Sequence, residues 1–267
     1  ERGKPSIPPR IIRMKFLVIG LGSIGQRHVR NLRLLYGDRH ELSTVRTANP
    51  TGLLNEHRRA VKDDSVERHY NIRRFKDMED ALSDRPDAVF VTNPTSLHAS
   101  TALIAAGHGC NLFIEKPVSD ELAAAEALLD LVESKDLISM VGYQYRFHPC
   151  LRRLKRALQD GSLGAIVAAR LEVGEYLPDW HPYEDYRKSY AARRVMGGGV
   201  LLSQIHELDY VYWLFGFPKK VFAIGGHLSS LDLDVEDVVS VSFECFVDGQ
   251  LIPVHVHQDY VQRPPKR

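Results

Sequence analysis

The feature that most constrains the fold is an alternation of short apolar runs with helical segments through the first half of the chain. Residues 15–20, KFLVIG, have the length and apolar content of a buried parallel strand, and 23–37 carry apolar residues at helical spacing. Further strands are predicted at 41–47, 86–94, 110–117 and 137–147, with helices at 75–82, 96–109 and 119–135. Because strands that alternate with crossover helices form a parallel, doubly wound sheet, we predict an α/β domain of the Rossmann type over residues 14–147.

After residue 147 the pattern changes to long runs in which apolar and polar residues alternate. Helices are predicted near 149–158 and, as one continuous amphipathic helix, near 199–215, and the alternating runs are 165–176, 219–230, 237–249 and 250–261. Asp248-Gly249 is a hairpin signal between the last two runs. We therefore expect residues 148–267 to form an α+β domain with an open, mainly antiparallel sheet that buries one face.

Bulk properties narrow the classes of function. The 267 residues carry a formal net charge of +1, which gives no reason to expect a nucleic acid or an anionic membrane as partner. No apolar run approaches ~20 residues, the length needed to span a bilayer. The three cysteines form no CxxC pair, which favours a cytoplasmic protein without disulfides. No metal site is expected, because His255 and His257, which share a strand face, have no evident further ligand.

Three glycines in GLGSIG directly follow the first predicted strand and open the first predicted helix. In this context Gly20, Gly22 and Gly25 fit a dinucleotide fingerprint: a tight turn, close approach of the backbone to a pyrophosphate, and close packing of helix against strand. An acidic residue about 20 positions on would favour NAD. Arg46, followed by Thr47, stands there instead, and because a guanidinium pairs with a 2′-phosphate we predict NADP(H), with NAD(H) as the alternative.

Two further segments hold candidate acid/base groups. Lys116 ends a buried strand at the sheet edge where such folds bind ligands, although a lysine at a strand end is more often a solvated charge. In the predicted helix 199–215, Ser203, His206, Asp209 and Tyr210 share a polar strip. Asp209 lies one turn after His206 and would orient its imidazole, unless the histidine is only a core residue.

The chain resembles the glucose–fructose oxidoreductase/inositol dehydrogenase/MocA (Gfo/Idh/MocA) family of NAD(P)-dependent oxidoreductases. The resemblance is carried by GLGSIGQRH, TNPTSLHASTALIAAG, EKP, GYQYRFHP and GGGVLLSQIHELD, in this order from Met14 onward. Two departures stand out. Ser203 takes the place where many relatives carry Asp, and relatives usually continue beyond Arg267, so the chain looks truncated at its C-terminus.

The resemblance implies a role for each matched residue. Lys116 and His206 would be catalytic. The dinucleotide would be held by Gly20, Gly22, Ser23, Ile24, Gly25, Asn93, Pro94, Thr95, His98, Glu115, Lys116 and Arg146, in addition to Arg46 and Thr47, which are expected there from their position after the second predicted strand. The substrate would meet Tyr145, Ser203, His206 and Asp209, and the open sheet would serve a homo-oligomer.

The segment 177–199 is predicted to form the substrate-side loop. Trp180, Tyr186 and Arg187 offer stacking faces and a cation, which suits a sugar or polyol with a negative group. The loop also resembles that of family members in cell-surface sugar biosynthesis, which implies a substrate of that kind. A loop stabilised by its own aromatic residues fits equally well. The leading hypothesis is a sugar or polyol dehydrogenase or reductase. The alternatives are a non-catalytic, cofactor-binding regulator of the same fold and an inactive truncated product.

Overall fold

Six parallel strands form the first sheet of the computed structural model, which describes residues 13–46, 52–61 and 65–267. Their order is β3-β2-β1-β4-β5-β6, with β1 Lys15–Ile19, β2 Glu41–Val45, β3 Arg73–Arg74, β4 Ala88–Val91, β5 Asn111–Ile114 and β6 Ser139–Val141. In register, Ile19 lies beside both Val45 and Val91, and Val91 lies beside Ile114. The carboxyl ends of β1, β2, β4 and β5 therefore meet at one edge, as predicted for a doubly wound fold.

Helices cover both faces of this sheet because its strands are apolar on both sides. Leu17 and Ile19 pack with α3 (Met78–Ser83), α4 (His98–Gly107) and α5 (Leu122–Ser134). Phe16 and Val18 point the other way, into a second cluster with α1 (Ser23–Tyr36) and the short α2 (Val66–His69). Both faces of β1 are thus buried, as a near-continuous apolar strand requires.

The second sheet has four strands in the order β7-β10-β9-β8. They are β7 Ala169–Gly174, β8 Lys220–Gly226, β9 Val238–Val247 and β10 Gln250–Asp259. The pairs β8–β9 and β9–β10 are antiparallel and β7–β10 is parallel, so the prediction of a mainly antiparallel sheet is confirmed. Positive φ angles at Asp248 and Gly249 confirm the predicted hairpin turn.

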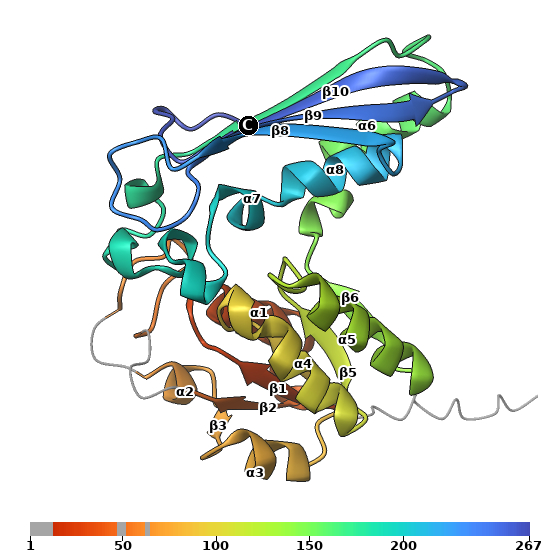
Figure 1. Cartoon of the computed structure of the whole chain (residues 1–267). Helices are drawn as coiled ribbons and strands as arrows, with labels where there is room; N and C mark the ends of the chain where they lie inside the picture. The colour runs from red at the N-terminus through yellow and green to blue at the C-terminus, as the bar shows by residue number, and fades with distance from the viewer. Residues whose placement is uncertain (1–12, 47–51, 62–64) are drawn as a thin grey trace, which may run out of the picture.

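One face of the second sheet is buried. Val239, Val241 and Cys245 of β9 alternate inward with Ile252 and Val254 of β10. Figure 1 shows α8 (His206–Phe215) and α6 (Pro149–Gln159) on this side, toward the first sheet, with α7 (Val200–Ser203) between the two sheets. The opposite face carries no helix in the figure.

The structure corrects two local predictions. The expected continuous helix over 199–215 is two helices, α7 and α8, which are separated at Gln204 and Ile205. Gln204 is buried and its side chain donates to the Asp259 carbonyl, so contacts with β10 take the place of a continued helix. Ser119 does not cap α5, which begins at Leu122, because its hydroxyl accepts from Glu121 N in a turn before the helix.

Two further observations concern the described residues only. None of their helices has both the length and the apolar character needed to cross a bilayer. Their His, Cys, Asp and Glu side chains form no group of three or more that could hold a metal ion.

Candidate active site

The turn after β1 has the geometry of a dinucleotide-binding turn. Gly20 has φ +93°, and a Cβ there would lie 2.8 Å from the backbone of Thr92 and Asn93. A Cβ at Gly25 would lie 2.0 Å from the Gly20 carbonyl oxygen, so α1 packs directly on the turn. Only glycine fits at either position.

The N-terminus of α1 fits a bound pyrophosphate. Gly22 is its N-cap and supplies no side-chain cap, and the first turn, which holds Ser23 and Ile24, contains no acidic residue. A Cβ added at Gly22 would meet no described heavy atom within 4 Å, so there is open space in front of the backbone. N–H groups at a helix start, without a cap and with space before them, suit a diphosphate.

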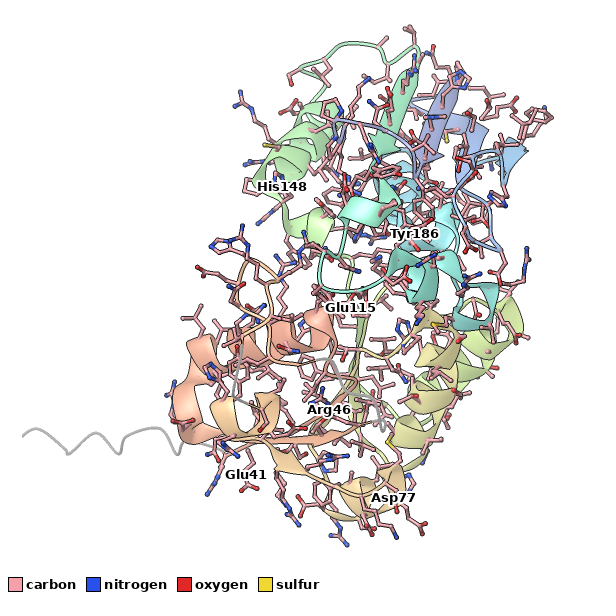
Figure 2. All side chains as sticks on the ribbon, turned by 90° about the vertical axis from the view of Figure 1, so that its left-hand side faces the viewer. Glu41, Arg46, Asp77, Glu115, His148 and Tyr186 are labelled. Atoms are coloured by element: carbon pink, nitrogen blue, oxygen red, sulfur yellow. The ribbon has the colours of Figure 1, made fainter. Side chains whose placement is uncertain are left out.

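Arg46 follows β2 at the same edge, but its guanidinium already has an acidic partner. Arg46 Nη1 lies 3.0 Å from Glu67 Oε1, and its side chain is 5% exposed. Figure 2 shows Arg46 in the lower half of the molecule, within the first sheet's layer. A 2′-phosphate would meet Glu67 together with Arg46, and no sequence pattern predicted this pairing. Thr47 lies outside the described residues.

The segment after β4 supplies buried polar groups near the glycine turn. Asn93 Nδ2 donates to Thr101 Oγ1 at 2.9 Å, while Asn93 Oδ1 is buried without a hydrogen-bond partner among the described residues. Pro94 precedes a 3-10 helix that begins at the buried Thr95. His98 Nε2 lies 2.7 Å from the Asn93 carbonyl oxygen, so this ring holds the backbone of the segment. An unpartnered amide oxygen beside the turn is consistent with a ligand that carries hydroxyl groups.

Lys116 follows β5 and reaches across to the second half of the chain. Its Nζ donates to the Ser203 carbonyl oxygen of α7 at 2.7 Å. Loss of hydration in the surrounding protein lowers the pKa of the Lys116 amine, and Glu115 opposes this change. Glu115 itself is buried, and Figure 2 shows it where the two halves meet. A lysine that sheds its proton more readily suits acid/base work.

His206, the first residue of α8, is buried close to Lys116. Burial is the main cause that lowers the pKa of its imidazole to about 3, and Lys116 and Arg267 act in the same direction. Its Nε2 lies 3.4 Å from Gln144 Nε2, and the Tyr145 ring packs edge-on at 4.6 Å between centroids. Its Nδ1 has no partner among the described residues. The neutral ring therefore keeps one free nitrogen near the lysine.

The expected contact between Asp209 and His206 is absent. Asp209 instead binds Arg146 through two guanidinium nitrogens, with Nε 2.8 Å from Oδ2 and Nη2 2.5 Å from Oδ1. The Asp209 side chain is 5% exposed, and a bidentate guanidinium satisfies a buried carboxylate better than one imidazole N–H. Arg146, expected at the cofactor, and Asp209, expected at the substrate, thus hold each other and tie the start of the second half to α8.

The substrate-side loop is mostly bound to its own half of the chain. The Trp180 ring packs edge-on against Tyr260 at 5.3 Å, and Arg187 pairs with Asp185. The Tyr186 hydroxyl accepts from Asp232 N at 3.2 Å, and Figure 2 shows Tyr186 in the upper half, apart from the first sheet. These contacts hold the three side chains within their own half, but Trp180 Nε1 is buried without a hydrogen-bond partner among the described residues, so both interpretations of the loop stay predictions.

Several residues at the site were missed from the sequence. His28 Nε2 lies 2.7 Å from Glu115 Oε1, Tyr183 hydrogen-bonds Ser23 in the glycine turn, and Arg267 pairs with the buried Glu207. Arg267 also donates to the Tyr145 hydroxyl. His28 closes the motif GLGSIGQRH and Glu207 follows His206 in GGGVLLSQIHELD, but the partners of both residues are far away in the sequence, and so are those of Tyr183 and Arg267.

Comparison with known families identifies the family to which this fold belongs. The model described as "Oxidoreductase family, NAD-binding Rossmann fold" matches residues 14–143, and the model of the "GFO/IDH/MocA C-terminal domain" matches residues 151–264. Together they account for most of the chain, so this protein belongs to the Gfo/Idh/MocA family of oxidoreductases. The resemblance inferred from five motifs is confirmed.

Among curated proteins, the chain is similar to inositol and sugar dehydrogenases. It is 29% identical over 236 residues to the myo-inositol 2-dehydrogenase of Thermotoga maritima, with 85% of this chain and 64% of the relative aligned. It is 30% identical over 148 residues to the levoglucosan dehydrogenase of Pseudarthrobacter phenanthrenivorans, with 54% of this chain and 37% of the relative aligned. The chain thus spans less than two thirds of either relative.

Among solved structures, the chain is similar to the WlbA dehydrogenase of Chromobacterium violaceum in complex with NADH and UDP-GlcNAcA. The TM-score is 0.77 at 23% identity, over 98% of this chain and 71% of that one. The UDP-N-acetylglucosamine 3-dehydrogenase GnnA of Acidithiobacillus ferrooxidans matches with a TM-score of 0.69 at 24% identity, over 96% and 73% of the two chains. At these identities the likeness establishes the fold.

Proposed function

We propose that the chain acts as an NAD(P)-dependent oxidoreductase that moves a hydride between nicotinamide and a hydroxyl-bearing or keto carbon of a sugar or polyol derivative. The observation that carries the proposal is a convergence at one sheet edge. The glycine turn after β1, Asn93 after β4 and Lys116 after β5 meet there, and Lys116 Nζ contacts the Ser203 carbonyl 2.7 Å away. That contact brings His206 of α8 to the same place.

The protein's own residues would bind the dinucleotide and the substrate, orient them, and move a proton. A bound nicotinamide would supply the hydride acceptor or donor. In oxidation, the Lys116 amine takes the proton of the substrate hydroxyl, and in reduction the ammonium returns it to the forming hydroxyl. The lowered pKa of Lys116 enlarges the fraction of free amine. Neutral His206 offers a second hydrogen-bonding group to the same hydroxyl without adding a like charge.

The choice of dinucleotide turns on the Arg46–Glu67 pair. NADP(H), predicted from Arg46, stays a prediction, because the Glu67 carboxylate 3.0 Å from the guanidinium would repel a 2′-phosphate. Glu67→Gln keeps the size of the side chain and removes its charge. If Arg46 reads a 2′-phosphate, this variant should bind NADPH about tenfold more tightly, about 1.4 kcal/mol, with NADH affinity unchanged.

The substrate class is proposed from the relatives. Myo-inositol and scyllo-inositol dehydrogenases and the UDP-sugar enzymes share ring carbons that bear hydroxyl groups. A small sugar or polyol, in the context of surface-sugar biosynthesis, is our candidate. The domain division after residue 147, the cytoplasmic location and the homo-oligomer through the open sheet remain predictions beside it.

The test combines binding with turnover. Calorimetric titration with NADH and with NADPH comes first, followed by a screen of inositols and UDP-N-acetylhexosamine derivatives for cofactor absorbance changes. Lys116→Met should abolish turnover and keep cofactor binding. The matched control is Lys135→Met, whose ammonium caps the Gly107 carbonyl at an exposed helix end. A folded chain that binds neither dinucleotide would refute the proposal, and binding without any turnover would favour the regulator.

A further inference from the structure

The turn that carries the reactive lysine is held from both faces of the first sheet. Residues 115–117 follow β5, with α1 packed on one face and α4 on the other. One histidine reaches the turn from each helix, His28 from α1 and His98 from α4. Neither has a part in the proton transfer described above.

On the α1 side, His28 holds the side chain of Glu115. Its Nε2 lies 2.7 Å from Glu115 Oε1, with the two side chains 15% and 10% exposed. The His28 ring packs on Phe113 at 4.8 Å and Phe90 at 5.8 Å, which fixes its direction. A Cβ at Gly142 would come within 3.3 Å of the same carboxylate, so the carboxylate has little room to move.

Glu115 passes this constraint to the backbone of Lys116. Its second oxygen, Oε2, accepts from the Lys116 backbone N–H at 3.2 Å. The lysine side chain has four rotatable bonds, so holding it in one conformation costs conformational entropy. The direction of the side chain therefore depends on the position and orientation of the Lys116 backbone. From this backbone position, Lys116 Nζ reaches the Ser203 carbonyl oxygen.

On the α4 side, His98 anchors the next residue. Its Nδ1 lies 2.7 Å from the Pro117 carbonyl oxygen and its Nε2 lies 2.7 Å from the Asn93 carbonyl oxygen, and the residue is 2% exposed. The far end of the turn is therefore tied to the segment after β4. His28 is the more accessible of the two anchors and the one that acts through a side chain.

We propose that His28 is a positioning residue for Lys116, acting through Glu115. The hydrogen bond from His28 fixes the carboxylate, the carboxylate fixes the Lys116 amide, and the amide directs the amine toward the Ser203 carbonyl of α7. The inference rests on the proposed role of Lys116 in proton transfer. It assigns to the histidine that follows the glycine motif a task in acid/base chemistry rather than in dinucleotide binding.

The proposal is tested on the amine itself, so that no substrate is needed. Lysine amines are labelled competitively with acetic anhydride over a range of pH, and mass spectrometry gives the titration midpoint of Lys116 with Lys135 as an internal reference. Four charged groups act on Lys116 in this titration: Glu115, Glu207 and Glu175 raise its pKa, and Arg267 lowers it. His206 lies close by, and burial lowers the pKa of its imidazole to about 3, so it is neutral where the lysine titrates.

His28→Phe keeps the aromatic packing and removes the hydrogen bond, and His28→Asn is a shorter second variant that cannot span the distance. In either folded variant the Lys116 midpoint should rise by about one pH unit as the amine gains access to water, with Lys135 unchanged. His28→Gln removes any ring charge and keeps an N–H donor, and should restore the wild-type midpoint. The matched control is His108→Phe, because His108 Nδ1 lies 2.9 Å from Ile104 O at an exposed helix end, away from the turn.

The outcomes separate this inference from the proposed function. A folded His28→Phe or His28→Asn protein with the wild-type Lys116 midpoint overturns the positioning role, whatever turnover shows. A raised midpoint that His28→Gln does not restore also overturns it, because ring charge would then explain the shift. A raised and restored midpoint in a chain without dehydrogenase activity supports the positioning role and counts only against the proposed function. In an active chain, kcat should fall tenfold in His28→Phe with cofactor Kd unchanged.

Discussion

Adding one methyl group at Gly25 should destabilise the fold through the glycine turn. The new Cβ would lie 2.0 Å from the Gly20 carbonyl oxygen and 2.9 Å from Thr92 Oγ1, while ordinary contact begins at 3.4 Å. The nearest partner is backbone and cannot rotate away, so α1 or the turn must shift by more than 1 Å. Overpacking of this kind costs about 1–3 kcal/mol, and we expect the upper end of that range.

The assay is equilibrium unfolding of Gly25→Ala in guanidinium chloride, followed by circular dichroism, together with a thermal scan. For a chain of this size, 3 kcal/mol corresponds to a Tm lower by roughly 6–12 °C. Dinucleotide affinity should fall as well, because the turn that presents the N–H groups is displaced. A Gly25→Ala protein as stable as the wild type would refute the close approach of α1 to the turn.

Gly22→Ala is the matched control, since it makes the same chemical change three residues away. Gly22 has φ −67° and ψ −170°, which alanine adopts freely, and its Cβ would meet open space. The free energy of unfolding should stay within about 1 kcal/mol of the wild type. Affinity for NADH or NADPH should nevertheless fall at least tenfold, about 1.4 kcal/mol, because the methyl group enters the space assigned to the pyrophosphate. Unchanged affinity in a folded Gly22→Ala protein would contradict that assignment.

Three further predictions concern buried charged and titratable groups. Arg146→Met removes the partner of the buried Asp209 carboxylate and should lower the free energy of unfolding by about 3 kcal/mol. In urea titrations, the double variant Arg146→Met, Asp209→Leu should recover part of this lost stability. A double variant no more stable than Arg146→Met alone would contradict the pairing. Because burial lowers the pKa of His206 to about 3, its ring NMR shifts should stay those of a neutral imidazole from about pH 5 to 8, and an inflection in that range would refute this. Burial raises the pKa of the Glu207 carboxyl from 4.5 to about 7, so the folded protein holds this proton more tightly than the unfolded chain does. The stability that this group contributes at pH 4.5 is therefore lost as the pH rises to 7. Glu207→Gln should make the Tm depend less on pH between 4.5 and 7.

The sequence predicts the first sheet well because its signals are local. The apolar runs FLVI, AVFV and LFI lie in the parallel strands β1, β4 and β5, which end together as the fold class requires. The exception is β3, Arg73–Arg74, which is two exposed residues long and has no apolar pattern to reveal it. β3 is defined by its backbone pairing with the neighbouring strand β2, and no side-chain periodicity in the sequence indicates it.

The candidate site residues that the sequence singles out most sharply are those where a motif and a strand end coincide. Gly20, Gly25 and Lys116 are of this kind, and the structure gives each a physical reason for its place. Arg46 shows the limit: the residue was identified, but its partner Glu67 lies 21 residues away on a helix of four residues. No local pattern connects the two, so the charge balance at the end of β2 could not be foreseen.

Asp209 shows why side-chain spacing alone misleads. Residues three apart on a helix are neighbours, and this spacing predicted a contact between His206 and Asp209. The carboxylate had a second possible partner, Arg146, 63 residues earlier in the chain. A guanidinium offers two parallel charge-assisted hydrogen bonds, whereas a neutral imidazole offers one ordinary bond, so a buried carboxylate gains more from the arginine. The consequence is chemical: with Asp209 paired to Arg146, burial, Lys116 and Arg267 all lower the pKa of His206, and the imidazole stays uncharged beside Lys116. A neutral ring leaves the amine of Lys116 as the group that exchanges the proton.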